Sequence, residues 1–160
     1  MAARVNLFSN PTSTAARAAG HFGLASKTIL QDSTLPAATQ KLVLLRASQI
    51  NGCGYATDVW SKNAAHAGET STRINLVATW RESTVFTDAE RAALDLTEQG
   101  TRIADAAGGV TDEAWSTAAK HYDEDQLSDL VMLIALINAT NRMGVIVRQR
   151  GGDYEPGRLG

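Results

Sequence analysis

The sequence predicts an all-α protein, and its composition carries that prediction. Alanine is abundant, only three prolines occur, and no run of alternating β-branched residues is present. The 160 residues, of which 44% are hydrophobic, suffice for one buried core and are few for two ordinary domains. We expect one domain over residues 1–160, with a core at about residues 35–147 and a flexible tail at 151–160.

The first helix is expected to begin at Asn10, a good cap, because Pro11 suits the first helical position. It should run to Gly20 or beyond. The residues expected on its inner face are Ala15, Ala18, Ala19 and Phe22.

Pro36 opens a second helix, and Asn51 with Gly52 gives it a stop signal. The apolar positions expected to form its buried stripe are Leu42, Val43, Leu45 and Ile50. A third helix should begin at Cys53 or just after it and end at Gly68.

A further helix is expected over residues 71–80, from its apolar spacing. Thr87 and Glu90 form a capping box, so the next helix should start at Asp88 and continue until Gly108. Thr111 then caps a short helix.

The last helix should open at Asp123, with Gln126 completing a capping box, and run to about Val147. Between residues 127 and 137 it is apolar on nearly every side, which a surface helix could not be. It is therefore the central helix of the domain or part of a subunit contact, and we favour the first interpretation.

Charge and hydropathy argue against several classes of partner. The 15 basic and 17 acidic residues are interspersed, with no basic cluster, so we expect no nucleic-acid binding. The longest apolar run, residues 130–137, is too short to span a membrane, and the N-terminus resembles no signal peptide. We therefore expect a cytoplasmic protein that does not bind membranes. Its single cysteine, Cys53, excludes an intramolecular disulfide and a cysteine-based zinc site.

Three stretches of the sequence carry a specific family resemblance. LRASQINGCGYATD at residues 45–58 resembles the active-site segment of the AhpD-like alkylhydroperoxidase branch of the carboxymuconolactone decarboxylase family. KNAAHAGET at 62–70 and RINLV at 73–77 are also similar to that branch, so the resemblance covers most of residues 35–147. It implies an AhpD-like helical domain assembled as a homo-oligomer, usually a trimer or hexamer. It also implies a dithiol site that reduces organic hydroperoxides or passes electrons to a partner, with a thiol reductant and no cofactor.

The chemistry of such a site follows from a thiol at a helix N-terminus. The unpaired N–H groups and the positive end of the helix dipole favour the thiolate, which attacks the peroxide and becomes a sulfenic acid. In the family a second thiol, in a C-x-x-C spacing, resolves that species into a disulfide. A histidine four residues after the second cysteine shares its helical face and relays protons.

This sequence departs from the family pattern at three positions. Ala56 stands where the second cysteine is expected, Trp60 where the relay histidine is expected, and Lys41 where the family often has an acidic residue. In the family the second cysteine is taken to attack the peroxide, so Cys53 corresponds to the resolving thiol. Ala56 reflects either natural divergence or a deliberate replacement, and Trp60 and Lys41 favour divergence.

Two other polar residues of this segment each have two possible roles. Asp58 either tunes the pocket or caps and solvates the helix, and Tyr55 either donates a hydrogen bond into the pocket or packs against the preceding helix. His66 is expected on the surface or at an interface. His21 and His121 have no second ligand at metal spacing, so we expect no metal site.

Three functions are compatible with these residues. The first is a thiol-dependent peroxidase, or an impaired relative, with Cys53 as the only available thiol and an organic hydroperoxide as substrate. The second is a cofactor-free lyase that resembles the decarboxylase branch of the family. The third is a non-catalytic oligomer whose pocket, lined by Tyr55, Trp60 and Trp80, binds a small apolar ligand. We favour the first.

Overall fold

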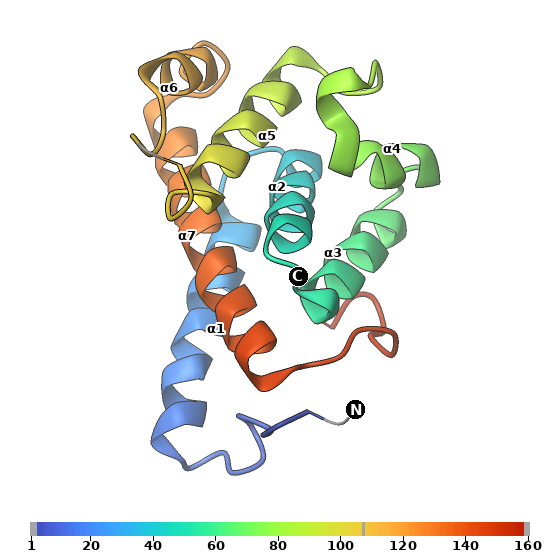
Figure 1. The fold of residues 1–160 in the computed structure, drawn as a ribbon, viewed down its shortest axis with the longest axis vertical. Coiled ribbons are helices and arrows are strands. Elements are labelled where there is room, and N and C mark those ends of the chain that lie inside the picture. Colours follow the sequence, from blue (N-terminus) through green and yellow to red (C-terminus); the bar gives the residue numbers. More distant parts are fainter. Residues whose placement is uncertain (1–2, 107, 159–160) are drawn as a thin grey trace.

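A computed structural model describes residues 3–106 and 108–158, and this part of the chain holds helices and no strand (Figure 1). The all-α prediction is therefore confirmed. In chain order the elements are α1 (Thr14–Asp32), α2 (Ala37–Ile50), α3 (Gly54–His66), α4 (Ser71–Leu76), the 3₁₀ helix η1 (Val77–Glu82), α5 (Asp88–Thr101), α6 (Asp112–Ala118) and α7 (Glu124–Val147).

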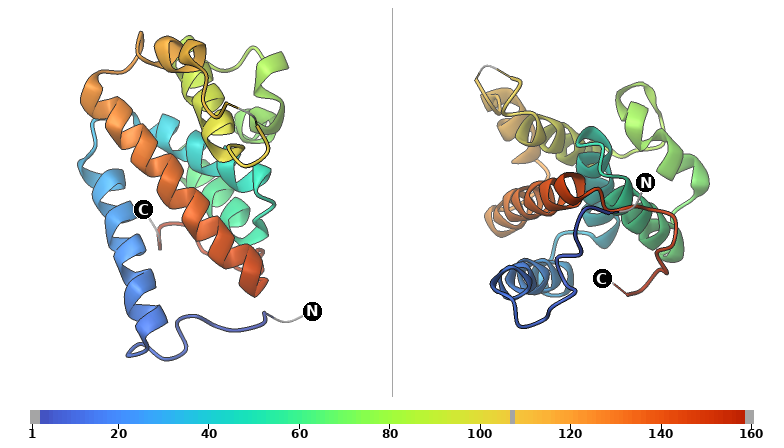
Figure 2. Two further views of the ribbon diagram at one scale, coloured as in Figure 1. Left: turned by 60° about the vertical axis from the view of Figure 1, so that its left-hand side comes forward. Right: turned by 60° about the horizontal axis from the view of Figure 1, so that its bottom comes forward.

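Two helices, α2 and α7, organise the core. Helix α2 packs against α3, α5, α7 and η1, and α7 packs against α1, α2, α3 and α5. Figure 2 shows α7 passing between α1 on one side and the α2–α3 pair on the other. The predicted capping box at its start is present, with Asp123 accepting from the Gln126 amide and Gln126 accepting from the Asp123 amide. The position of α7 explains why its sequence is apolar on several sides.

Helix α7 is nevertheless not covered everywhere. Val131, Met132, Val145 and Ile146 remain between 43% and 65% exposed. Among the described residues it is the one helix long and apolar enough to cross a bilayer, but half of its most apolar window is buried in the domain. A core helix of a soluble protein has the same length and composition.

Helix α1 begins later than the sequence suggested. Asn10 closes a turn by accepting from the amide and hydroxyl of Thr12, and the helix is capped by Ser13, which accepts from the Ala16 amide. Pro11 therefore lies in the turn that precedes the helix and not at the first helical position. The inner face is rotated in consequence: its buried residues are Ala16, Ala19 and Ile29, whereas Ala15, Ala18 and Phe22 are exposed.

Two further helix boundaries differ from expectation. The segment at residues 71–80 is not one helix, because Thr79 takes a non-helical conformation and the chain tightens into η1 from Val77. Helix α5 starts at Asp88 with the predicted capping box, but it ends at Thr101 instead of reaching Gly108. Ile103, which a longer helix would have placed on the apolar stripe, is 58% exposed.

The two ends of the chain both contact the helices. Near the N-terminus, Arg4 donates from its amide to Val147 O and from its guanidinium to Ile146 O, so it pairs carbonyls at the end of α7. Residues 151–158 have no regular helix, as expected for a tail. They nevertheless make several hydrogen bonds with α3, which argues against free motion of this segment.

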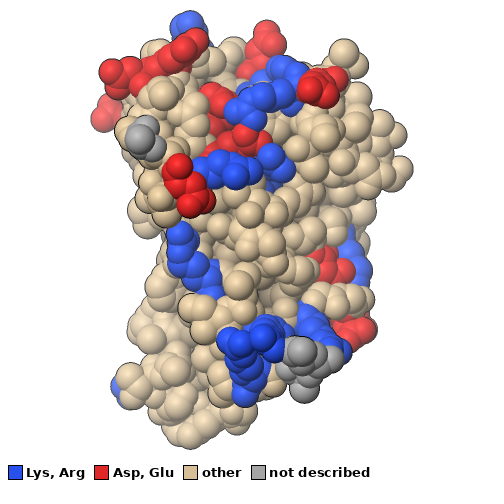
Figure 3. Space-filling model, viewed as in Figure 1, with Lys and Arg blue, Asp and Glu red and all other residues tan. Residues whose placement is uncertain are grey.

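A carboxylate on α5, Glu98, anchors a charged cluster with residues of α2 and η1. Its Oε1 accepts from Arg46 Nε at 2.7 Å and from Trp80 Nε1 at 2.9 Å, and its Oε2 pairs with Arg81. Burial acts to raise the pKa of Glu98, but these donors together hold it below its ordinary value. Figure 3 shows acidic and basic side chains interleaved on the upper part of this face, whereas several basic side chains gather at its lower end.

Glu98→Gln should destabilise the fold by about 1–3 kcal/mol at neutral pH, because it removes a buried charge from Arg46 and Arg81. The pKa of Glu98 is lowered in the folded chain, so its contribution is present above the unfolded carboxyl pKa and is lost as pH falls through the folded pKa. Thermal unfolding between neutral and acid pH measures both effects. The matched control is Asp95→Asn, which removes a more exposed partner of Arg81 and should cost only about 0–1 kcal/mol.

Candidate functional site

The site is built on the turn between α2 and α3. Gly52 adopts a φ of +63°, a conformation that favours glycine, and the Cys53 amide then donates back to Ser48 O at 3.0 Å. Asn51 donates from Nδ2 to Asn138 Oδ1 on α7 at 2.9 Å. These bonds fix the turn against α7, and they place Cys53 at the first residue before α3.

Cys53 occupies the N-cap of α3, as the sequence predicted. The side chain of Cys53 forms no capping hydrogen bond, but the nearby backbone N–H groups of Tyr55 and Ala56 act to lower the pKa of the thiol and so favour the thiolate. The side chain is only 2% exposed, however, and this burial outweighs the two donors, so the pKa of Cys53 is raised above its ordinary value. This shift of the pKa is opposite in direction to the lowering expected from the helix N-terminus alone. At neutral pH the resting group is therefore the protonated thiol.

Gly144 of α7 lies directly against this thiol. A Cβ added at Gly144 would stand 3.0 Å from Cys53 Sγ, which is closer than ordinary van der Waals contact. Sequence reasoning did not single out Gly144. The available signal was an isolated glycine inside a strongly helical pattern, which often marks a close approach of another group.

Two of the three family positions that differ in this chain lie in the core. Ala56 and Trp60 are 8% and 9% exposed and belong to the cluster of buried hydrophobic residues around Cys53. Lys41 bonds to Ala37 O on its own helix. None of these three side chains supplies a thiol, an imidazole or a carboxylate to Cys53.

Glu98, a buried carboxylate that sequence reasoning missed, does not replace the missing acid. Both of its oxygens are held by Arg46, Arg81 and Trp80. A glutamate four residues after Leu94, on the apolar stripe of α5, was the signal that could have identified it.

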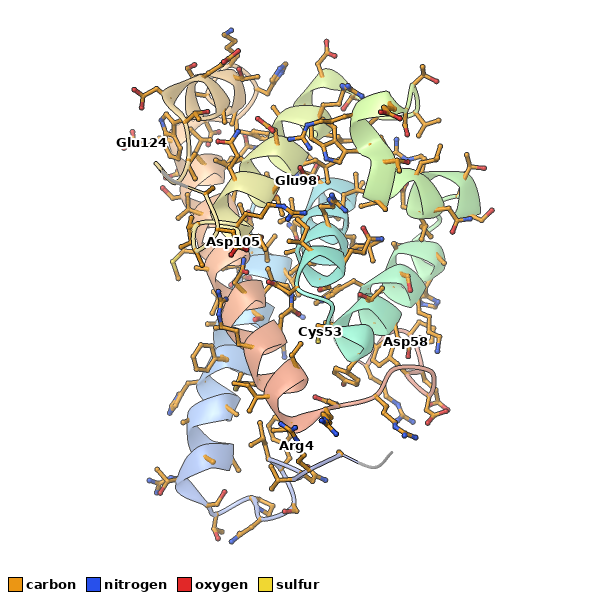
Figure 4. All side chains as sticks on the ribbon, in the orientation of Figure 1. Arg4, Cys53, Asp58, Glu98, Asp105 and Glu124 are labelled. Carbon is orange, nitrogen blue, oxygen red and sulfur yellow. The ribbon has the colours of Figure 1, made fainter. Side chains whose placement is uncertain are left out.

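Tyr55 and Asp58 are half-buried residues in the first turns of the same helix, and Figure 4 labels Asp58 there. A hollow of about 360 Å³ opens beside Tyr55, and its lining residues are Tyr55, Arg150, Asp153, Tyr154, Glu155 and Arg158. Burial raises the pKa of Tyr55, and the nearby Tyr154, Asp58 and Cys53 raise it further. Tyr55 therefore keeps its proton and lies close enough to Cys53 to interact with it electrostatically.

Asp58 holds the tail. Its Oδ1 pairs with Lys62 at 2.8 Å, and its Oδ2 accepts from the amides of Gly152 at 2.7 Å and Tyr154 at 3.2 Å. Burial acts to raise the pKa of Asp58, but Lys62 and the two amides lower it, and the net direction is down. The sequence did not predict this contact between Asp58 and the tail.

The aromatic pocket expected from Tyr55, Trp60 and Trp80 is not formed by these three residues together. The hollow beside Tyr55 includes neither tryptophan, and Trp80 bonds to Glu98. The three histidines, His21, His66 and His121, are exposed. Over the described part of the chain, no three His, Cys, Asp or Glu side chains gather in a group that could hold a metal ion.

Comparison with known proteins agrees with this geometry. Residues 13–99 match the family model of the carboxymuconolactone decarboxylase family. The chain belongs to this family. The uncharacterised protein YdfG of Bacillus subtilis, strain 168, is 36% identical to it over 120 residues, which cover 75% of this chain and 80% of YdfG.

Two solved structures share the fold of this chain. A protein of unknown function from Agrobacterium tumefaciens, described as a candidate antioxidant defence protein AhpD, superposes with a TM-score of 0.83 at 32% identity over 96% of this chain and 100% of that one. The debrominase Bmp8, in a cysteine-to-alanine variant bound to 2,3,4-tribromopyrrole, superposes with a TM-score of 0.74 at 20% identity over 84% of this chain and 71% of Bmp8. The fold of the chain is AhpD-like, and proteins with this fold differ in their chemistry.

Gly144→Ala should destabilise the protein by about 1–3 kcal/mol, because the new methyl group meets Cys53 Sγ in a packed core. The combination with Cys53→Ala should recover most of that loss. Urea unfolding of the single and double variants measures the coupling.

Gly23→Ala on α1 is the matched control, since nothing lies within 4 Å of its added Cβ. It should stabilise the chain by about 0.5–1 kcal/mol through helix propensity. Equal responses at Gly23 and Gly144 would contradict the close contact.

Proposed function

We propose that this chain is a thiol-dependent peroxidase of the AhpD-like branch that uses Cys53 as its single redox-active thiol. The observation that carries the proposal is the placement of Cys53 at the N-cap of α3, where the backbone N–H groups of Tyr55 and Ala56 act to lower the pKa of its thiol. Those donors stabilise negative charge on sulfur when the thiolate forms. The likeness to the Agrobacterium tumefaciens protein described as an AhpD antioxidant defence candidate supports the same activity.

The proposed reaction uses an organic hydroperoxide and an external thiol. The Cys53 thiolate attacks the terminal peroxide oxygen; an S–O bond forms, the O–O bond breaks, and the alkoxide takes a proton to leave as an alcohol. A small-molecule thiol then attacks the sulfenic acid, releases water and forms a mixed disulfide. A second thiol attacks that bond, which yields the external disulfide and restores Cys53. Ala56 explains why the resolving step must come from outside the chain.

Hydroperoxide consumption in excess dithiothreitol tests this reaction. The chain should consume cumene hydroperoxide faster than Cys53→Ser, and its rate should rise from neutral to alkaline pH because the raised pKa keeps the thiol protonated at neutral pH. Ala56→Cys should raise the rate by about tenfold or more, because it supplies an intramolecular thiol. Equal rates for the chain and Cys53→Ser would exclude Cys53 as the reacting group.

A second candidate function is binding or cofactor-free conversion of a small molecule in the hollow beside Tyr55. The observation that favours it is the loss of the thiol and imidazole positions to Ala56 and Trp60, while a hollow of about 360 Å³ remains at the same helix end. A chain that consumes no peroxide but whose melting temperature rises with a small apolar ligand would support binding. Loss of the ultraviolet absorbance of a lactone would support the lyase.

We also propose that the chain works as a homo-oligomer, a trimer or hexamer, in the cytoplasm. Exposed apolar side chains on α1 and α7, among them Leu24 at 63% and Ile146 at 65%, support a subunit contact.

Light scattering after size-exclusion chromatography should therefore give three or six times the chain mass of 17.0 kDa. Ile146→Glu should lower the mass, because a charge would replace apolar contact area. Ile103→Glu, at a 58% exposed position after α5, is the matched control and should leave the mass unchanged. A monomer at every concentration would contradict the assembly.

A further inference from the structure

The segment that follows α7 crosses the helix end that carries Cys53. We name residues 149–158 the strap. The Gln149 amide still bonds to Gly144 O at the end of α7, and from there the chain turns toward α3. Figure 4 shows the strap leaving the end of α7 and passing beside the N-terminal turns of α3, near the labelled Asp58.

The first attachment of the strap is to Asp58 and Lys62, one turn apart on α3. Asp58 Oδ2 accepts from the Gly152 and Tyr154 amides, at 2.7 and 3.2 Å. Lys62 Nζ donates to the carbonyls of the same two residues, at 2.7 and 3.1 Å. In this ion pair on α3, the aspartate therefore binds backbone N–H groups of the strap and the lysine binds backbone carbonyls of the same two strap residues.

The second attachment is to Asn63, which is 6% exposed. Its Oδ1 accepts from the hydroxyl of Tyr154 and from the amide of Gly157, both at 3.1 Å. A buried amide oxygen with two strap donors extends the contact along α3 beyond the first turn. The strap is thus held at two places by side chains of one helix.

Between these attachments and α7 the strap backbone lies unusually close to α3. A Cβ added at Gly151 would stand 2.5 Å from Gly54 O and 2.9 Å from Asp58 Cβ, so the strap can pass here only with a glycine. Gly54 is the residue after Cys53. The strap is therefore packed on the turn that presents the thiol.

We propose that the strap is a lid over Cys53, latched by Asp58, Lys62 and Asn63, whose opening admits reagents to the thiol. The proposal rests on the proposed function in one respect, since it names how access to that site is regulated. Cys53 is 2% exposed with the strap in place, and the strap residues Tyr154 and Arg150 line the hollow beside Tyr55. The latch bonds join the strap to α3 alone, so the latch opens without disturbing the packing of α2 against α7.

Modification of Cys53 by 5,5′-dithiobis(2-nitrobenzoic acid) in the native full-length chain tests the lid directly. The chain has a single cysteine, so the absorbance reports one site. Asp58→Ala removes the latch from the α3 side, and Gly151→Ala displaces the strap from its own side. Each should speed the reaction by about tenfold or more, at an unchanged urea midpoint.

Asp105→Ala is the matched control, because Asp105 is an exposed carboxylate outside the strap and outside the lining of the hollow, and its loss changes the net charge as Asp58→Ala does. It should react at the rate of the parent chain. Hydrogen exchange of the Gly152 and Tyr154 amides checks that the two latch variants have released the strap.

Two results would overturn the lid. One is an unchanged modification rate in a variant whose Gly152 and Tyr154 amides exchange freely. The other is a parent rate that increases with urea as steeply as global unfolding does, since Cys53 would then be reached only through the unfolded chain. The test uses no hydroperoxide, so an inactive chain with a working lid refutes the proposed function alone.

Discussion

The turn between α2 and α3, tied to α7, is the constraint on which the rest of the site depends. Gly52 makes the turn possible, and the bonds from Cys53 to Ser48 and from Asn51 to Asn138 hold it. Because α2 also contacts α5 and η1, the turn is fixed by the core of the whole domain. A thiol placed this way has little freedom to move, and its reactivity depends on what surrounds it.

Those surroundings set two opposing effects on the thiol. The amides at the start of α3 favour negative charge, whereas the packing of Gly144 and the neighbouring apolar side chains removes water and disfavours it. Burial is the larger effect in this chain. The reactivity of such a site towards hydroperoxide therefore depends on how water and substrate reach the sulfur. In our proposal the strap, which is bonded to α3, controls that access.

Sequence patterns predicted the elements with strong local signals. The capping boxes at Thr87 and Asp123 and the stop at Asn51–Gly52 are all in the structure, because a cap depends on residues a few positions apart. The predicted start of α1 was wrong, because the sequence offers two capping residues close together. Asn10 closes a turn before the helix, and Ser13 caps the helix itself. The packing of Gly144 on Cys53 and the hold of Asp58 on the strap join residues about 90 positions apart, and no local pattern encodes such contacts.

The charged cluster on α5 has an optical consequence. Trp80 donates its indole N–H to Glu98, and the guanidinium groups of Arg81 and Arg91 lie 4.3 and 5.3 Å from its ring centroid. The emission of this buried indole responds to the local electric field, so its wavelength reports the protonation of one carboxylate. Trp115, 44% exposed, responds mainly to solvent. In a Trp60→Phe variant, which removes the buried indole of the cluster that includes Cys53, intrinsic fluorescence thus gives a label-free view of the η1–α5 contact.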